Sequence, residues 1–391
     1  FTGADASNYV ISGGSTYSGT NGSITQLNSV TYTGPNSGGN WSNPANWTTT
    51  GTNVIGAIPD LSNVANVIIP AGSTVVYDNA VAGPVHTTVT DNGAINIASS
   101  SAISMPMIIN GTGSVNITGV GQVTLTGNNS YTGGTSLASG SSLIAANANA
   151  IGNAVINSNG GSFGTSSSVV LPSLTVTGTL TLTSDIATVG AQSYGNLVLA
   201  DTSNNGAIAN TLSLTSQNAN ISILGTIDGQ TAITKTVLRT TGQLDTVSYS
   251  NESLVVNAGS GTVTLGDSIG ATLRINQLTV TGNSIYILAD ILTQGAQTYN
   301  GTVYIGDGTY LGRALTQGAL YTRYNAYFTY QLGLEPTTNY FNNADTRYAR
   351  ILISEDPSVV FNGVVNDVSQ FTHTLLVGAI QNGATANPNN A

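Results

Sequence analysis

This chain has no cysteine and very little charge, and both absences restrict what it can be. Without cysteine it has no disulfide framework and no thiolate ligand for a metal. Only 6% of its residues are charged, against roughly a quarter in typical soluble domains, so its surface must present hydroxyl and amide groups. The seven basic residues all lie after position 234, and the formal net charge is -10. This balance disfavours nucleic acid and anionic membranes as partners.

Long apolar runs and helix-forming residues are also scarce. No run approaches the roughly 20 apolar residues that cross a bilayer, so we expect no membrane span in this chain. Glu and Lys are rare, whereas Gly alone numbers 47 and Ser, Thr and Asn are abundant, which disfavours helices. A hydrophobic fraction of 40% still supplies enough apolar surface for folding, so a disordered chain is not expected. The composition indicates an all-β protein.

Short apolar triplets recur along the middle of the chain. From about residue 95 the runs INI, VNI, VTL, LTV, LTL and LVL are each followed by Gly, Asn or Ser. Strands this short and this regular predict a parallel β-helix, or β-solenoid, over residues 34–309. Residues one turn apart in such a stack lie about 4.8 Å apart, so Val, Ile and Leu should form interior columns. Asn and Thr should form hydrogen-bonded ladders at the bends.

An internal repeat supports this fold. Segments 174–199 and 278–305 share LTVTG, an Asp-Ile pair or its equivalent, GAQ and a Tyr in the same order. The repeat places Asp185 and Asp290 at equivalent positions, and Gln192 and Gln297 likewise. We therefore interpret these four residues as turn or ladder residues, not as catalytic groups.

The two ends of the chain differ from the middle. Residues 1–33 are polar and Gly-rich and are interpreted as an extended arm or a first turn, whereas 381–391 is interpreted as a flexible tail. Residues 310–380 are rich in Tyr and Arg, and their alternating aromatics predict a β module that caps or assembles the solenoid. The residues predicted for an assembly or interaction surface are Tyr9, Tyr321, Arg323, Tyr324, Tyr327, Phe328 and Tyr330.

Two tryptophans lie close together in the segment GGNWSNPANW. Trp41 and Trp47 are interpreted mainly as aromatics of the core or of a cap. The alternative is an exposed pair that stacks on carbohydrate, although no paired carboxylates or glutamines flank them.

Catalytic groups are not evident in this sequence. A glycosidase needs two nearby carboxylates, and the sole adjacent acidic pair, Glu355 and Asp356, precedes a proline and is interpreted as a turn. A polysaccharide lyase needs a basic residue, but Lys235 and Arg239 have no acidic neighbours in sequence. A polysaccharide-degrading β-helix enzyme is therefore kept only as a minor alternative.

Metal and crosslink signals are equally sparse, and we expect no cofactor. Gly266-Asp267 and the GDG sequence at 306–308 could bind calcium, but plain turns explain them equally, and the glycine-rich array of calcium rolls is missing. His86 and His373 lack metal-ligand spacing. An isopeptide crosslink of Lys235 with an Asn, assisted by Glu252, is a further alternative.

Three segments resemble known surface proteins. LTGNNSYTGGTSLASGSSLIAANANAIG (125–152) resembles the autotransporter-associated β-strand repeat, and 253–282 with GAQTYNG (295–301) is similar to repeats of filamentous-haemagglutinin-like proteins. The stretch GNWSNPANW is similar to segments of the same proteins. The resemblance implies a right-handed β-helix that is exported to the bacterial surface. The NPNGI motif of two-partner secretion and the strands of a translocator barrel are not found, so the secretion route stays open.

We therefore expect a non-enzymatic, extracellular structural or adhesin solenoid of a bacterial surface or biofilm matrix. Its partners would be other copies of itself, extracellular glycans or a host surface. The alternative is a subunit that assembles head-to-tail into an extracellular filament by strand addition.

Overall fold

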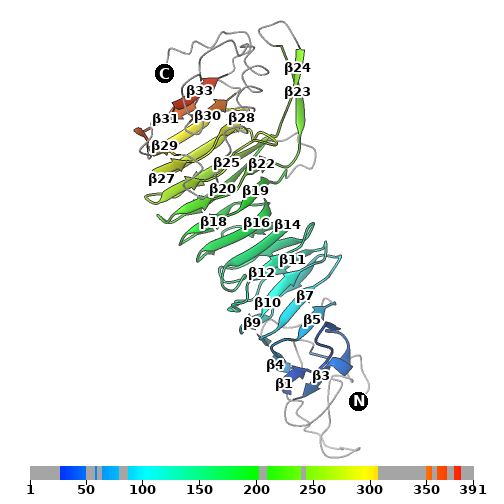
Figure 1. The fold of residues 1–391 in the computed structure, drawn as a ribbon. Coiled ribbons are helices and arrows are strands. Elements are labelled where there is room, and N and C mark those ends of the chain that lie inside the picture. Colours follow the sequence, from blue (N-terminus) through cyan, green and yellow to red (C-terminus); the bar gives the residue numbers. More distant parts are fainter. Residues whose placement is uncertain are drawn as a thin grey trace, which may run out of the picture. The chain divides into compact units, whose positions relative to one another are not determined.

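The computed structural model describes residues 27–49, 58–59, 64–78, 87–201, 209–238, 244–306, 349–354, 359–367 and 374–379. The chain divides into two compact units, residues 1–172 and 173–391, and each is described by itself. The described parts consist of β-strands joined by turns, with one short 3-10 helix at Pro44–Asn46 and no α-helix (Figure 1). No helix among these residues is long and apolar enough to cross a membrane.

The strands of unit 1 are short and follow one another closely. They are β1 (Leu27–Tyr32), β2 (Gly39–Asn40), β3 (Trp47–Thr49), β4 (Val64–Ile69), β5 (Thr74–Tyr77), β6 (Thr88–Asp91), β7 (Ala94–Ile97), β8 (Ile103–Met105), β9 (Ile108–Asn110), β10 (Ser114–Ile117), β11 (Gln122–Leu125), β12 (Thr135–Leu137), β13 (Ser142–Ala145), β14 (Val155–Thr165) and β15 (Val170–Leu171).

Parallel pairing at a nearly constant interval organises unit 1. Along β5, β7, β10 and β12, the residues Val75, Ile95, Val115 and Thr135 are successive partners at intervals of 20 residues. A neighbouring series joins β8, β11, β13 and β14 through Ile103, Val123, Leu143 and Phe163, at the same interval. These side chains are buried, so like apolar residues stack in columns.

Amides stack in the same way on the outside of the sheet. Asn116 Nδ2 donates to Asn96 Oδ1 at 2.9 Å, and Ser136 Oγ donates to Asn116 Oδ1 at 2.7 Å. These residues alternate with the buried ones along β7, β10 and β12. The ladder predicted for the bends thus also occurs along a strand face, where each rung satisfies the polar groups of the next.

Aromatic rings fill the N-terminal part of unit 1. Trp41 lies against Trp47 with ring centroids 4.9 Å apart, and Tyr32 and Tyr77 each meet one of these indoles edge-on at 5.4 Å. Trp41 Nε1 donates to the carbonyl of Pro59, and Trp47 Nε1 donates to the carbonyl of Trp41. Both indoles are 0% exposed, so they lie in the core and neither presents a face to a sugar. β3 pairs antiparallel with β1 beside this cluster, and β1 pairs parallel with β4.

Unit 2 contains several long strands and one hairpin. Its strands are β16 (Leu174–Leu182), β17 (Ile186–Thr188), β18 (Gln192–Tyr194), β19 (Asn196–Leu199), β20 (Asn210–Ser216), β21 (Ile221–Ile223), β22 (Ile227–Gly229), β23 (Ile233–Leu238), β24 (Leu244–Tyr249), β25 (Glu252–Asn257), β26 (Thr262–Leu265), β27 (Leu278–Ile287), β28 (Ile291–Thr293), β29 (Gln297–Ile305), β30 (Ala349–Ser354), β31 (Val359–Phe361), β32 (Val365–Asp367) and β33 (Thr374–Ala379).

The stacked strands of unit 2 also pair in parallel. One column passes through Leu214, Val256, Val280, Tyr299 and Phe361, from β20 to β31. The hairpin β23–β24 is antiparallel, forms a sheet of its own and stands away from the stacked strands (Figure 1). The fold is therefore all-β with large parallel sheets, as the sequence predicted.

Several predicted segments are described only in part. β1 belongs to the predicted N-terminal arm 1–33, and most of that arm lies outside the described residues. Of the predicted module 310–380, residues 310–348 lie outside them as well. Its later residues form β30 to β33, which continue the parallel pairing: β30 pairs with β28, and β31 and β32 with β29. The predicted tail 381–391 is not described.

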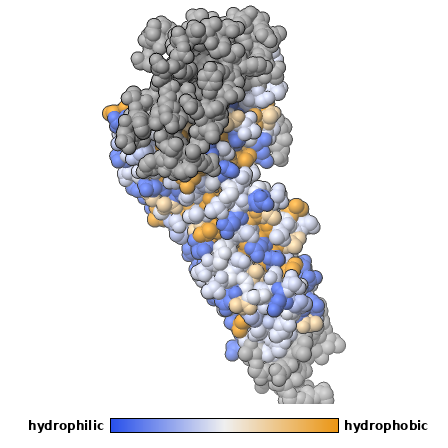
Figure 2. Space-filling model, viewed as in Figure 1, coloured by the Kyte–Doolittle hydropathy of each residue, from blue (hydrophilic) through white to orange (hydrophobic). Residues whose placement is uncertain are grey.

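The described surface is polar with scattered apolar residues. Figure 2 shows one face on which hydrophilic and intermediate residues cover most of the described area. The large hydrophobic residues exposed among the described residues are Val120, Val170, Val189, Leu224, Val360, Val364 and Val365.

One carboxyl group lies inside unit 1. Asp91 ends β6, is 0% exposed and accepts a hydrogen bond from the Gly93 N–H at 2.9 Å through Oδ1. Its Oδ2 has no hydrogen-bond partner among the described residues. Gly113 makes room for the group, because a Cβ there would lie 2.3 Å from the Asp91 carboxyl carbon. Burial raises the pKa of Asp91 to about 7, although the Gly93 hydrogen bond lowers it in part.

This raised pKa predicts that unit 1 loses stability as the pH rises. The unfolded chain ionises near the ordinary value of 3.8 and the folded chain near 7, so the free energy of unfolding should fall between these values by about 4 kcal/mol. Asp91→Asn should remove most of this pH dependence. Urea denaturation at pH 4.5 and pH 8 measures the free energy of unfolding of unit 1. Fluorescence of Trp41 and Trp47 follows the transition, because both tryptophans lie in unit 1.

Asp228→Asn is the matched control, because Asp228 lies in unit 2 and binds the N–H groups of Thr272 and Leu273. It should keep the pH dependence of the parent chain. An unchanged pH dependence in Asp91→Asn would contradict the assignment to Asp91.

Candidate functional site

Two long strands of unit 2 bend at glycine. β27 bends near Gly282, where its register with β29 shifts between Thr281 and Ser284, and β29 bends at Gly301. Gly301 has a φ of 148°, and a Cβ there would lie 1.8 Å from the Gly282 carbonyl oxygen. Gly363 repeats the close approach, since its Cβ would lie 2.2 Å from the Gly301 oxygen. Glycine is therefore required where these bends stack.

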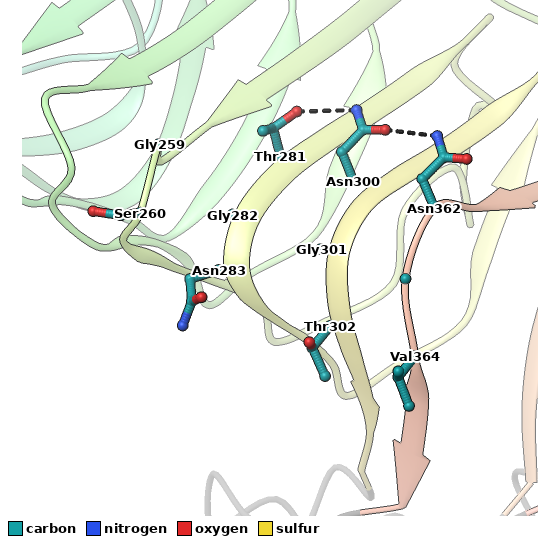
Figure 3. Close-up of a pocket in the computed structure, with 11 residues that line it drawn as sticks. Gly259, Ser260, Thr281, Gly282, Asn283, Asn300, Gly301, Thr302, Asn362 and Val364 are labelled. Atoms are coloured by element: carbon teal, nitrogen blue, oxygen red, sulfur yellow. Dashed lines mark hydrogen bonds between the residues drawn. The ribbon is translucent and has the colours of Figure 1, made fainter.

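A polar groove follows this line of bends (Figure 3). It has a volume of about 520 Å³. Its lining contains no charged residue and consists of Gly259, Ser260, Thr281, Gly282, Asn283, Asn300, Gly301, Thr302, Asn362, Gly363 and Val364. Among the residues that the structure describes, the groove thus offers backbone, hydroxyl and amide groups and no group that could transfer a proton near neutral pH.

A hydrogen-bonded row forms one wall of the groove. Asn300 Nδ2 donates to Thr281 Oγ1 at 3.1 Å, and Asn362 Nδ2 donates to Asn300 Oδ1 at 2.8 Å (Figure 3). The row joins β27, β29 and the residue that follows β31. Asn362 and Asn283 are the exposed amides of the lining. Such preformed amides can bind hydroxyl groups through both their oxygen and their nitrogen.

A tyrosine pair lies on the outer face of the same strands. Tyr286 and Tyr304 are register partners whose rings stack at 4.9 Å with an interplanar angle of 15°. Thr264 is the partner of Tyr286 and Asn366 the partner of Tyr304, so the aromatics continue an otherwise polar column.

The first copy of the internal repeat has a similar polar row. Asn196 Nδ2 donates to Thr179 Oγ1 at 3.2 Å, and Asn196 Oδ1 accepts from the Thr226 N–H at 3.0 Å. Gly195 lies beside Gly178 at this bend, and its Cβ would lie 2.4 Å from the Gly178 oxygen. The groove therefore lies at a glycine bend that occurs in both copies of the repeat.

The repeat also contains two equivalent networks inside the unit. Tyr194 OH donates to Gln192 Oε1 at 2.7 Å, and Gln192 Nε2 donates to Thr188 Oγ1 at 3.1 Å. In the second copy Tyr299 OH donates to Gln297 Oε1 at 2.9 Å, and Gln297 Nε2 donates to Thr293 Oγ1 at 3.2 Å. Both glutamines are buried residues at the start of strands, whereas the repeat predicted turn or ladder residues.

The other sequence candidates fall into two groups. Tyr9, Tyr321, Arg323, Tyr324, Tyr327, Phe328 and Tyr330 lie outside the described residues, as do His86, Arg239, Glu355, Asp356 and His373. Trp41 and Trp47 lie in the core of unit 1 and not at the groove.

Two acidic residues that the sequence placed in turns bond to nearby backbone. Asp185 Oδ1 accepts from the Ser213 N–H at 2.8 Å, and Asp267 Oδ1 accepts from the Ser268 N–H at 2.8 Å, which are structural roles. Of the GDG sequence at 306–308 only Gly306 is described. No group of three or more His, Cys, Asp or Glu in the described part of the chain could hold a metal ion.

Sequence reasoning missed the groove. Its signal was the glycine that ends LTVTG and the NG pairs at Asn300 and Asn362, but which residues flank the bend depends on strands far apart in sequence. The chain matches no protein-family model, no curated protein and no solved structure.

The internal network predicts a selective effect of tyrosine substitution. Tyr299→Phe should lower the free energy of unfolding of unit 2 by about 1–3 kcal/mol, because it removes the hydrogen bond that the tyrosine donates to the buried Gln297 oxygen. Tyr304→Phe, on the outer face, should change it by no more than about 0.5 kcal/mol. Guanidinium denaturation followed by far-UV circular dichroism compares the two variants, and equal effects would contradict the prediction.

Proposed function

We propose that this chain is a non-enzymatic, right-handed β-helix of a bacterial surface or extracellular matrix, and that it acts as an adhesin or structural element. The 20-residue interval that recurs between paired strands from β5 to β13 supports the helical winding, because one turn of chain then returns each side chain above its equivalent. The right hand and the exported location rest on the resemblance to autotransporter and haemagglutinin-like repeats.

The observation that carries the proposal is the uncharged, hydrogen-bonding groove at the glycine bends. Extracellular glycans present many hydroxyl groups, and the Asn362 and Asn283 amides can pair with such groups without a cost for burying charge. The stacked Tyr286 and Tyr304 add an aromatic surface on the same strands. Neutral polysaccharide is therefore the partner class that we assign to the groove.

Polysaccharide binding without turnover tests this function. The purified chain should bind to immobilised neutral glucan and galactan more strongly than to alginate, because carboxylates would face a negatively charged protein. The double variant Asn283→Ala and Asn362→Ala should weaken binding about 30-fold, since each lost hydrogen bond is worth about 1 kcal/mol. Biolayer interferometry measures the affinity, and a reducing-sugar assay measures turnover.

Asn149→Ala is the control, because Asn149 is an exposed bend residue of unit 1 that bonds only to Asn128 through its side chain amide. It should bind like the parent chain. Release of reducing ends would favour the polysaccharide-degrading enzyme, and equal binding of both variants would remove the groove from the proposal.

A second candidate function is a filament subunit joined by strand addition. β31 and β32 each pair with β29 alone among the described strands, and Val360, Val364 and Val365 on these segments are exposed. Phe361 is half-buried, although the Tyr299 ring beneath it is fully buried. Edge strands with apolar side chains favour pairing with a further strand.

Electron microscopy of the purified chain separates the two functions. Long fibres that are lost in Val360→Lys with Val365→Lys would support strand addition at this edge, because charge opposes edge pairing. Val189→Lys is the control, since Val189 is 53% exposed elsewhere in unit 2. Single particles at all concentrations would exclude the filament.

A further inference from the structure

The polypeptide leaves the stacked strands of unit 2 at the end of β22. It then forms the hairpin β23–β24, which stands away from the stack (Figure 1). The chain returns through Ser250 to Glu252, the first residue of β25 and the register partner of Asn210 in β20. The base of the hairpin therefore lies beside β20, β22 and β25.

Buried oxygen atoms without partners gather at the base of the hairpin. Glu252 and Ser250 are both 0% exposed. Both carboxylate oxygens of Glu252, the Ser250 hydroxyl oxygen and Asn210 Oδ1 are buried without a hydrogen-bond partner among the described residues. Four such atoms in adjacent residues are unusual, because buried polar groups are normally paired.

Gly229, the last residue of β22, lies directly against these side chains. A Cβ at Gly229 would lie 1.9 Å from Ser250 Oγ and 2.9 Å from Glu252 Oε2. The Ser250 side chain therefore fills the room over the Gly229 Cα, and Glu252 Oε2 lies beside it. Any larger residue at position 229 would displace Ser250.

The Asp201 carboxylate is a like charge near Glu252. Burial raises the pKa of the Glu252 carboxyl above its usual range, and the Asp201 carboxylate raises it further, although the Ser250 hydroxyl and the backbone N–H groups of Glu252 and Gln230 lower it in part. Asp201 is itself only 5% exposed and its N–H donates to Gln230 Oε1 at 2.9 Å. The Arg274 carbonyl accepts from the Ser250 N–H at 2.7 Å, but its guanidinium is not among the groups that shift the Glu252 pKa.

We propose that Glu252, Ser250 and Asn210 form a calcium site that fastens the base of the β23–β24 hairpin to the stacked strands. Carboxylate, hydroxyl and amide oxygens are the ligands of hard cations, and all four unpartnered atoms are such oxygens. Calcium fits better than magnesium because it accepts irregular sets of protein oxygens, whereas magnesium keeps most of its water. Two nearby carboxylates favour a divalent over a monovalent ion.

The site has a structural consequence for the hairpin. A two-stranded hairpin is only marginally stable alone, and here its second strand leads directly into Ser250 and Glu252. A bound ion would join this end of the hairpin to Asn210, at the start of β20, and so hold the hairpin in place. The hairpin would then open more readily when calcium is removed.

Calorimetric titration of the purified full chain with CaCl₂ tests the site. The heat of binding should saturate, and the site should contribute one calcium ion per chain. Dissociation constants of extracellular calcium modules lie at about 10⁻⁴–10⁻³ M, and 5 mM CaCl₂ should therefore raise Tm by about 5 °C relative to EDTA. Glu252→Gln should bind one equivalent fewer and lose the Tm shift. Ser250→Ala keeps the charge and should weaken binding without abolishing it.

Asp185→Asn is the control, because Asp185 is an acidic turn residue of the same unit that binds the Ser213 N–H. It should keep the full stoichiometry and the Tm shift. Trypsin gives a second measurement, since Lys235 in β23 is the first basic residue of the chain and calcium should slow cleavage after it. No heat and no Tm shift in the parent chain would overturn the proposal in favour of buried water, and unchanged binding by Glu252→Gln would place calcium elsewhere.

Discussion

Parallel pairing in register, between strands that lie about 20 residues apart in unit 1, is the constraint on which the other features of that unit depend. It places each inward side chain over an equivalent one, so apolar residues such as Ile95 and Val115 exclude water as continuous columns. The same register places Asn96 under Asn116 on the outside. A slip of one residue would exchange the two faces along the whole series, so the pattern strongly specifies its own register.

Polar groups inside this architecture are either fully paired or costly. The Gln192 and Gln297 networks belong to the first kind, since each amide bonds to a tyrosine and a threonine. Asp91 and Glu252 belong to the second, since each has carboxylate oxygen without a partner among the described residues. At both places a glycine makes room for a packed polar side chain, Gly113 for Asp91 and Gly229 for Ser250.

The functional proposals follow from where the regular stack is interrupted. The groove lies where β27 and β29 bend at glycine, and the proposed calcium site lies where the chain leaves the stack and returns. Regular strands satisfy their own polar groups, whereas bends and excursions leave amides and carboxylates that can bind other molecules. The proposed glycan contact and the proposed ion would thus use the positions that the repeat itself leaves unsatisfied.

The sequence by itself determined the all-β class, the parallel short strands, the equivalence of Gln192 and Gln297 and the interpretation of Trp41 and Trp47 as core aromatics, because side-chain alternation and repeat spacing are local properties. Only the tertiary structure decided that Tyr77 packs against Trp41, since the two residues lie on strands that are distant in sequence. It likewise decided that Asn362 joins Asn300, and that Glu252 meets Asn210 and Gly229. These contacts join strands that are separated by connecting segments of different length, and no local sequence pattern encodes which strand pairs with which.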